Sequence, residues 1–391
     1  MTAPPPALAA TASSHRLRYV PALDGMRGLS LPGTILTHYA LFLQFRPSAP
    51  SWLRHTGPLA LNIQMFFVLS GALITSLLVA EHQRSGGVSL KSFYLRRSRR
   101  LGPALVAVLP VMAVAEVLWT GAGAVSPLGS HPWLALGAVA VFFGNWVLFA
   151  ISGGIGWLGP AWTLGIEEQF YLSWPIGLRA LLNRRAGRGA VLLVLAVAVV
   201  VGLAISTILY AHQRPSRVFY ATPTQLPSIL LGCALGYELT ANAEGMLRRL
   251  LRSRLVAVCG LAGMVVASIK MVGHTGFMYR GGYVLYGGFA CLLIGHCLAV
   301  AETGTFVSRV LGWKPFVVVG QISYEAYLVH TIVILAVAEI FPDMRVYPMM
   351  ALDTVLIAVS SAAFYYLVEQ PIRRRGWREA FKSRPEPTLT G

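Results

Sequence analysis

Long apolar segments recur through the whole chain and constrain its fold more than any other feature. A helix that crosses a bilayer needs about 20 predominantly apolar residues, and eleven segments of the 391-residue sequence approach or exceed that length. They are residues 28–45, 57–80, 101–120, 133–151, 162–182, 190–210, 224–240, 255–272, 283–301, 316–338 and 349–369. Only 12% of the residues are charged, against about 25% in typical soluble domains. The pattern predicts an all-α, polytopic transmembrane helix bundle and excludes a disordered chain, a coiled coil and a soluble enzyme.

The positive charge of the chain is concentrated in particular loops. Lys and Arg number 32 against 15 Asp and Glu, which gives a formal net charge of +17. A basic chain can bind nucleic acid, but in a membrane protein Lys and Arg gather in cytoplasmic loops. We favour the second explanation and expect no nucleic-acid partner. The basic segments are the N-terminal tail to Arg27, the loops near 81–100, 179–189, 241–254 and 302–315, and the C-terminal tail from Arg373. We therefore predict a multi-pass protein of the cell membrane with both termini in the cytoplasm.

The same loops limit the number of crossings. If all eleven segments crossed the bilayer, the basic loop 179–189 would lie outside, against the loop rule. Residues 133–178 should therefore make one net crossing, so one of the segments 133–151 and 162–182 is re-entrant or interfacial. The sequence does not say which. The stretch between them is Gly-rich and uncharged, and irregular backbone at membrane depth is tolerated only beside protein or a wet cavity, so we expect a cavity near 152–171.

We expect about ten crossings in all. They would form a membrane domain over residues 27–372, preceded by a cytoplasmic tail (1–26) and followed by a basic cytoplasmic tail (373–391).

His38 is the most informative polar residue within an apolar segment. It follows Arg27 by eleven residues, which on a helix is about 16 Å along the axis and close to the same face. Arg27 would then lie near the cytoplasmic mouth and His38 near mid-membrane. A histidine at that depth either makes a hydrogen bond between helices or serves as a base, because imidazole exchanges its proton near neutral pH.

Two further charged pairs stand near the ends of apolar segments. Arg97 and Arg100 share a helix face at i, i+3 and form either an anion clamp or an ordinary cluster of cytoplasmic charge. Glu167 and Glu168 diverge by about 100° on a helix. We therefore expect that both cannot face one partner and that at least one points into the cavity, the alternative being an ion pair with a neighbouring Arg.

No metal site is expected from this sequence. Cys233, Cys259, Cys291 and Cys297 all lie in apolar runs, without a CxxC pair or a His/Cys cluster. An Arg-lined mouth with a deeper histidine fits an enzyme that uses an anionic donor. It also fits a transporter or flippase for an anionic or glycosylated solute, although we detect no repeat of the kind that transporters often carry.

The chain contains six motifs that resemble those of a known family and occur in the same order. They are LDGMRGLSLPGTILTH, with Arg27 and His38; NIQMFFVLSGALIT; FYLRRSRRLGP, with Arg97 and Arg100; AWTLGIEEQFYLSWP; ISYEAYLVH; and LVEQP. From about residue 18 to 375 the chain resembles the acyltransferase-3 family of integral-membrane O-acyltransferases. The resemblance implies transfer of an acetyl or other short acyl group from acyl-CoA, as a donor substrate with no resident cofactor. The acceptor would be a sugar hydroxyl on a surface polysaccharide or on a glycosylated natural product such as a macrolide.

The resemblance also implies roles for individual residues. His38 would be the catalytic base or an acyl carrier, and Glu167 would match the acidic residue of the family's Trp-Ser-Leu-x-x-Glu motif. Arg27, Arg97 and Arg100 would lie on the donor side. Trp162, Tyr324 and His330 are further candidates for the pocket.

The chain departs from the family pattern at three places. Thr163 replaces the usual Ser, Gln225 stands where the family usually has Arg, and residues 62–65 read Asn-Ile-Gln-Met where many members read Gly-Val-Asp-Leu. The last two departures leave the acceptor open but not the reaction class. We expect no attached extracytoplasmic esterase domain and therefore a single-step transfer within the membrane domain. The acyl chain length and the oligomeric state also stay open.

Overall fold

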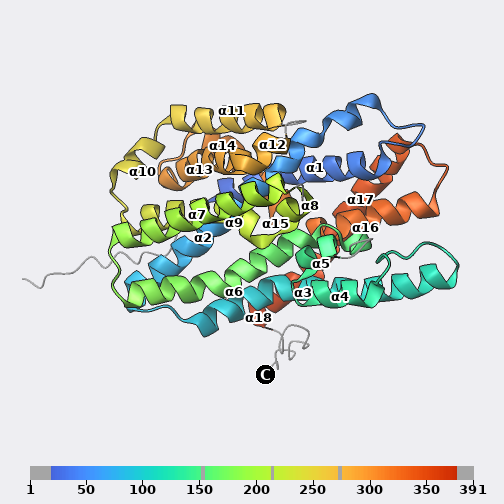
Figure 1. The fold of residues 1–391 in the computed structure, drawn as a ribbon, viewed down its shortest axis with the longest axis horizontal. Coiled ribbons are helices and arrows are strands. Elements are labelled where there is room, and N and C mark those ends of the chain that lie inside the picture. Colours follow the sequence, from blue (N-terminus) through green and yellow to red (C-terminus); the bar gives the residue numbers. More distant parts are fainter. Residues whose placement is uncertain (1–18, 151–154, 213–214, 272–274, 377–391) are drawn as a thin grey trace, which may run out of the picture.

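The computed structural model describes residues 19–150, 155–212, 215–271 and 275–376 (Figure 1). Within these ranges every regular element is a helix, which confirms the all-α prediction. The elements are α1 (Pro21–Leu43), η1 (Ser51–His55), η2 (Gly57–Leu61), α2 (Asn62–Ser85), α3 (Leu90–Gly121), α4 (Pro132–Ala140), α5 (Gly144–Ala150), η3 (Gly156–Leu158), α6 (Ala161–Asn183), α7 (Arg188–Ala211), α8 (Pro215–Tyr220), α9 (Thr222–Ala241), α10 (Met246–Leu251), α11 (Arg254–Met271), α12 (Thr275–Phe277), η4 (Met278–Gly282), α13 (Tyr283–Ala299), α14 (Phe306–Leu311), α15 (Lys314–Gln321), α16 (Ser323–Ile340), α17 (Val346–Phe364), η5 (Tyr365–Glu369) and α18 (Gln370–Arg375).

Seven helical stretches of the described chain are long and apolar enough to cross a membrane. They are α2, α3, α7, α11, η4 with α13, α16, and α17 continued through α18. Helices α1, α6 and α9 are also 23, 23 and 20 residues long, but they carry more polar side chains and fall outside this group. The multi-pass architecture is therefore present, and the total of about ten crossings stays a prediction.

The structure distinguishes segment 133–151 from segment 162–182, one of which was expected to be re-entrant or interfacial. Segment 133–151 is broken into α4 and α5, of nine and seven residues, and the break lies at Phe142, whose φ is 61°. At about 1.5 Å per residue, neither helix can cross a hydrocarbon core of about 30 Å. Segment 162–182 forms the single 23-residue helix α6. Part of the expected cavity near 152–171 falls on residues 151–154, outside the described residues.

A second difference concerns segment 316–338, which is two helices and not one. Helix α15 ends at Gln321, and α16 begins at Ser323, whose hydroxyl donates to the carbonyl oxygen of Gly320 at 2.8 Å. A side chain that bonds to the preceding backbone in this way competes with the regular helical pattern. The short α15 leaves α16 free to take its own direction.

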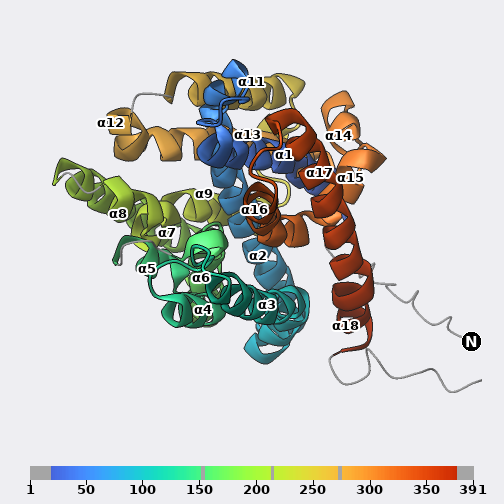
Figure 2. The same cartoon turned by 90° about the vertical axis from the view of Figure 1, so that its right-hand side faces the viewer.

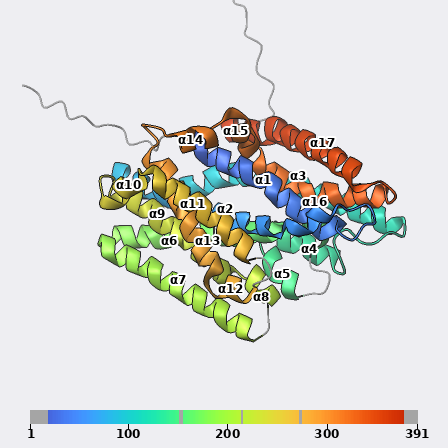
Figure 3. The same ribbon diagram turned by 90° about the horizontal axis from the view of Figure 1, so that it is seen from above.

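The long helices surround α2, which lies near the middle of the bundle (Figure 2). In the apolar stretch of α2, 72% of the residues are buried within the protein, against 22% in the apolar stretch of α7. Helices α7 and α17 lie along opposite edges of the molecule (Figure 3). The peripheral helices therefore present apolar side chains outward, as expected for surfaces that face lipid tails.

Helix α1 is held very close to α15. A Cβ atom added at Gly28 would lie 1.9 Å from the carbonyl oxygen of Phe316, and one added at Gly320 would lie 1.8 Å from that of Asp24. No larger residue fits at either position without moving the backbone, and small residues are the usual means by which membrane helices approach closely. This contact fixes the position of α1, which carries both Arg27 and His38.

The turn between α2 and α3 sets the height of the two arginines on α3. Helix α2 ends at Gly86, which adopts a left-handed conformation with φ of 71°, as glycine readily does. The hydroxyl of Ser89 then accepts a hydrogen bond from the backbone N–H of Ser92 at 3.3 Å and caps α3. Arg97 and Arg100 consequently lie in the second and third turns of α3.

Candidate active site

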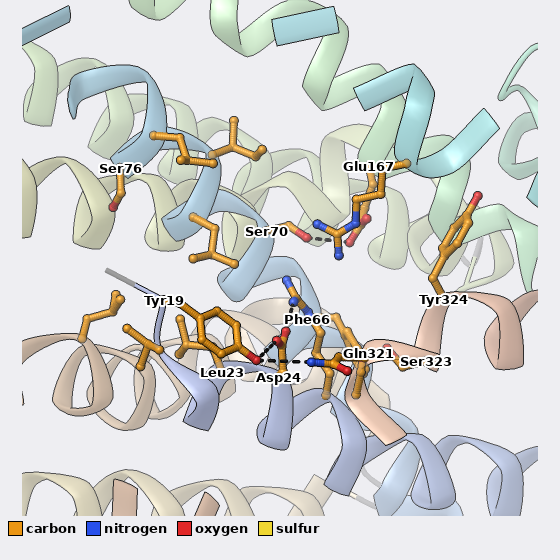
Figure 4. Close-up of a pocket in the computed structure, with 18 of the residues that line it drawn as sticks. Tyr19, Leu23, Asp24, Phe66, Ser70, Ser76, Glu167, Gln321, Ser323 and Tyr324 are labelled. Carbon is orange, nitrogen blue, oxygen red and sulfur yellow. Dashed lines mark hydrogen bonds and ion pairs between the residues drawn. The ribbon is translucent and has the colours of Figure 1, made fainter. Parts of the chain in front are cut away.

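A single elongated cavity of about 1070 Å³ collects most of the predicted site residues (Figure 4). Its wall includes one face of α2 from Ile63 to Gln83, a span of about 30 Å. We call the end near Thr34, Ile63, Thr163 and Tyr327 the inner end, and the end near Gln83, Thr240, Arg248, Arg252 and Glu302 the outer lobe. Five predicted site residues also line the cavity: Arg27, Arg97, Arg100, Glu167 and Tyr324.

Glu167 lies on the cavity wall and is held from two helices. Ser70 of α2 donates to its Oε1 at 2.9 Å, and the hydroxyl of Tyr171, one turn further along α6, donates to its Oε2 at 3.2 Å. Figure 4 shows Ser70 and Glu167 facing the cavity from one side, with Tyr19, Asp24 and Gln321 on the other. The prediction that at least one of the two glutamates points into the cavity is confirmed, and the alternative, an ion pair with a neighbouring Arg, is present as well.

Arg97 is engaged by both glutamates, which contradicts the expectation that they cannot share a partner. Its Nη2 lies 3.3 Å from Oε1 of Glu168 and 3.9 Å from Oε2 of Glu167. Its guanidinium carbon also lies 3.5 Å from the centroid of the Tyr171 ring, a cation–π distance. The expectation was wrong because it considered only the directions in which the two glutamates leave α6. The long side chain of Arg97, from the neighbouring helix α3, reaches both carboxylates.

The other two predicted donor-side arginines differ from Arg97 and from each other. Arg27 forms an ion pair with Asp24 at 2.8 Å, and Asp24 also accepts a hydrogen bond from Tyr19 at 2.8 Å. Arg100 lines the cavity yet makes no hydrogen bond or ion pair with any residue in the described part of the chain. Of the three predicted donor-side arginines, Arg100 is therefore the one without a partner in the described chain.

His38 does not line the cavity but lies one helical turn beyond Thr34 of its inner end. Its Nδ1 is 2.9 Å from the carbonyl oxygen of Thr34 and 3.1 Å from Nε2 of His330 on α16. The Nδ1 of His330 is in turn 2.8 Å from the carbonyl oxygen of Tyr327. The two imidazoles meet edge to face, with ring centroids 4.7 Å apart.

These partners assign the proton positions in the histidine pair. A carbonyl oxygen only accepts, so Nδ1 carries the hydrogen in both rings and shares it, in His38, between Thr34 and His330. In the neutral pair, Nε2 of His330 accepts and Nε2 of His38 keeps a lone pair without a partner among the described residues. Nε2 is thus the nitrogen of His38 that can accept a proton, and His330, which makes this contact, is fully buried.

The remaining candidates take different places. Tyr324 lines the cavity and donates to the carbonyl oxygen of Leu101 at 3.0 Å. Trp162 does not line the cavity but is buried among Phe67, Phe219 and Tyr220. The structure therefore brings Tyr324 to the cavity, His330 to His38, and Trp162 to an aromatic cluster.

Sequence reasoning missed Tyr327, which connects the cavity to the histidine pair. Its hydroxyl lies 2.8 Å from that of Thr163 and donates to the carbonyl oxygen of Pro160 at 2.9 Å, and its ring contacts that of His330. The signal was its position three residues before His330, which places both on one helix face. Ser70 and Tyr171 were missed too, although both lie within motifs that the sequence analysis singled out.

The two departures from the family pattern that left the acceptor open meet each other in the structure. Gln64 donates to the side-chain oxygen of Gln225 at 2.8 Å and accepts from Ser228 at 2.6 Å. Both glutamines are 1% exposed, and neither lines the cavity. They belong to the contact between α2 and α9.

The described part of the chain holds no group of side chains that suggests a metal centre. Within the described ranges, no three His, Cys, Asp or Glu side chains are grouped as metal ligands would be. The cavity wall thus offers a bridged glutamate pair and, in Arg100, an arginine without a partner in the described chain. One helical turn beyond its inner end lies Nε2 of His38, which has no partner among the described residues.

Comparison with known proteins agrees with this chemistry. The sequence model of a family described as an acyltransferase domain matches residues 20–381. Peptidoglycan O-acetyltransferase OatA of Listeria monocytogenes is 29% identical over 394 residues, which are 93% of this chain and 57% of that protein. O-acetyltransferase OatA of Staphylococcus aureus is 29% identical over 381 residues, which are 92% of this chain and 58% of that protein.

The chain therefore spans less than two thirds of the length of these relatives. No solved structure matches it. Because the family match runs over nearly the whole chain and the described fold is a bundle of apolar helices, this multi-pass membrane protein belongs to the acyltransferase domain family.

Proposed function

We propose that the protein transfers an acetyl or other short acyl group from acyl-CoA to the hydroxyl of a sugar. The observation that carries the proposal is Nε2 of His38, which has no partner among the described residues and belongs to a side chain one helical turn beyond the inner end of the cavity. A base in that place can accept the proton of an attacking hydroxyl. The relative from Listeria monocytogenes is named for the O-acetylation of peptidoglycan, which favours a sugar of a surface polymer over a macrolide as acceptor.

The reaction needs few steps. The acyl arm enters along the cavity and passes Thr34, so that the thioester carbonyl comes near His38. The acceptor oxygen attacks that carbonyl carbon while its proton moves to Nε2 of His38, the C–S bond breaks, and the thiolate of coenzyme A takes the proton. The products are the O-acyl sugar and free coenzyme A, and apolar walls limit hydrolysis of the thioester by excluding water.

The arginines and Glu167 have separate parts in this proposal. Arg100, assisted by Arg27, would bind the diphosphate of the donor, because an arginine fork suits phosphate oxygens. Arg97 holds Glu167 and Glu168 and so shapes the wall along which the acyl arm passes. The protein would lie in the cell membrane with both termini cytoplasmic, so that the cavity opens to the cytoplasmic pool of acyl-CoA.

The test is acyl transfer by the purified protein in lipid nanodiscs, with radiolabelled acetyl-CoA and soluble peptidoglycan fragments as acceptor. His38→Ala should lower transfer by at least about a hundredfold, the usual contribution of a general base, while the variant still inserts and elutes as the wild type. His212→Ala, which changes an exposed histidine after α7, is the matched control and should transfer normally.

Three results would contradict the proposal. Near-normal transfer by His38→Ala would remove His38 from the mechanism. Label retained on the wild-type protein without acceptor, and absent from His38→Ala, would make His38 an acyl carrier instead of a base. Uptake of an unmodified solute into vesicles, without any covalent product, would make the protein a transporter.

A further inference from the structure

The outer lobe of the cavity contains a second pair of arginines that the proposed mechanism does not use. Arg248 lies on the six-residue helix α10, and Arg252 caps its C-terminal end. Both line the same cavity as Arg100. In Figure 1, α10 lies at one end of the molecule, and in Figure 4 Ser76 and Tyr324 mark opposite ends of the part of the cavity that is drawn.

Arg248 is oriented by the protein but only partly satisfied. Its Nη2 donates to the carbonyl oxygen of Leu239 at 3.0 Å, while its Nε is shielded from solvent and has no hydrogen-bond partner among the described residues. Partial burial, together with the neighbouring charge of Arg252, lowers the pKa of Arg248. Two neighbouring arginines on one cavity wall are both stabilised by an anion that contacts them together.

The acidic residues of the lobe do not neutralise this pair by direct contact. Glu244 and Glu302 also line the outer lobe, but within the described residues neither forms an ion pair with Arg248 or Arg252. Carboxylates accept hydrogen bonds from amino and hydroxyl groups. The lobe thus offers donors for a phosphate and acceptors for a nucleoside, a mixture that suits a phosphorylated nucleoside better than a bare phosphate.

The length of the cavity fits the same ligand. About 30 Å of α2 separates Ile63 at the inner end from Gln83 at the outer lobe. Arg100, which has no partner in the described chain, lies on the wall of the same cavity. Acyl-CoA is similarly elongated: the thioester is at one end, the diphosphate is in the middle, and a 3′-phosphate on adenosine is at the other end. With the thioester near His38 and the diphosphate near Arg100, the remaining phosphate reaches the outer lobe.

We infer that the outer lobe binds the 3′-phosphoadenosine end of acyl-CoA, with Arg248 and Arg252 on the phosphate monoester. This inference rests on the proposed function, because it takes acyl-CoA as the donor. It makes the two arginines determinants of donor specificity, remote from the reacting atoms. The same phosphate chemistry also exists in anionic lipid headgroups, which the test must separate.

The test compares acetyl-CoA with acetyl-dephospho-CoA, which lacks only the 3′-phosphate. Wild-type protein should show a KM for acetyl-dephospho-CoA about tenfold or more above that for acetyl-CoA, as expected for lost charge-assisted hydrogen bonds. In R248Q/R252Q, the KM for acetyl-CoA should rise to the acetyl-dephospho-CoA value, whereas the KM for acetyl-dephospho-CoA should barely change. The control R249Q alters an exposed arginine on the same helix that does not line the cavity and should keep the wild-type preference.

Three other outcomes would contradict the inference or the proposed function. If R248Q/R252Q elutes normally and keeps the wild-type preference for acetyl-CoA, the inference is wrong. If the variant loses activity equally with both donors, and only in nanodiscs that contain phosphatidylglycerol, the arginines bind lipid headgroups and the inference is again wrong. If wild-type protein transfers acetyl from neither donor, the proposed function itself fails and the subsite with it, a result distinct from loss of preference alone.

Discussion

The contact between His330 and His38 gives His330 a positioning role that its substitution can test. Nδ1 of His330 donates to the carbonyl oxygen of Tyr327, so its Nε2 accepts from Nδ1 of His38 at 3.1 Å. This contact favours the tautomer of His38 in which Nε2 carries no hydrogen. His330→Met should lower kcat by about ten- to a hundredfold and leave the KM for acyl-CoA nearly unchanged. His330→Gln, which places an amide near the position of Nε2, should recover part of the lost kcat.

A structural role alone would give a different pattern for His330. If both variants lowered thermal stability and kcat together, without the partial recovery by Gln, the contact would serve packing and not orientation. Steady-state kinetics together with thermal unfolding in nanodiscs distinguishes the two cases.

Arg97 and Arg100 stand three residues apart on one helix, yet their environments predict opposite effects of substitution. Arg97 is bound to Glu167 and Glu168, so Arg97→Gln leaves two largely buried carboxylates unpaired and should cost about 3–5 kcal/mol of stability. Arg100 has no such partner in the described chain, so Arg100→Gln should leave the unfolding temperature unchanged and raise the KM for acyl-CoA about tenfold. Thermal unfolding and donor titration on both variants make the comparison. A stable Arg97→Gln variant with weakened donor binding would show that Arg97 is a ligand of the donor.

At the scale of helices, the sequence located most of the long elements but not their contacts. Apolar runs predicted α2, α7 and α11 within a few residues, because about 20 apolar residues suffice to predict a spanning helix. The break that separates α15 from α16 was not predicted, since both sides of it are apolar and only a serine-to-backbone hydrogen bond marks it.

The site shows the same division between what lies on one helix and what lies between helices. Spacing and motifs sufficed to propose five site residues: Arg27, His38, Arg97, Arg100 and Glu167. The structure places four of them on one cavity and His38 one turn beyond it. The His38–His330 contact joins positions 292 residues apart, a separation over which no periodicity carries information. The Gln64–Gln225 pair is a further example: each departure looked like a change at a binding surface, whereas together they are one hydrogen bond between α2 and α9.

At the scale of the whole molecule, the order of elements implies a definite topology. The loop at 122–131, between α3 and α4, and the basic loop at 184–187, between α6 and α7, are separated by α4, α5 and α6. Only α6, with 23 residues, is long enough to cross about 30 Å of hydrocarbon. The two loops should therefore lie on opposite sides of the membrane, with the arginine-rich one in the cytoplasm.

Reporter fusions test this topology. Green fluorescent protein fused after Gly187 should fluoresce, and alkaline phosphatase fused there should be inactive, because both would lie in the cytoplasm. Fusions after Gly123 should give the reverse pattern. Active phosphatase at both Gly187 and Gly123 would mean that α4 and α5 complete a crossing together, and this topology would be wrong.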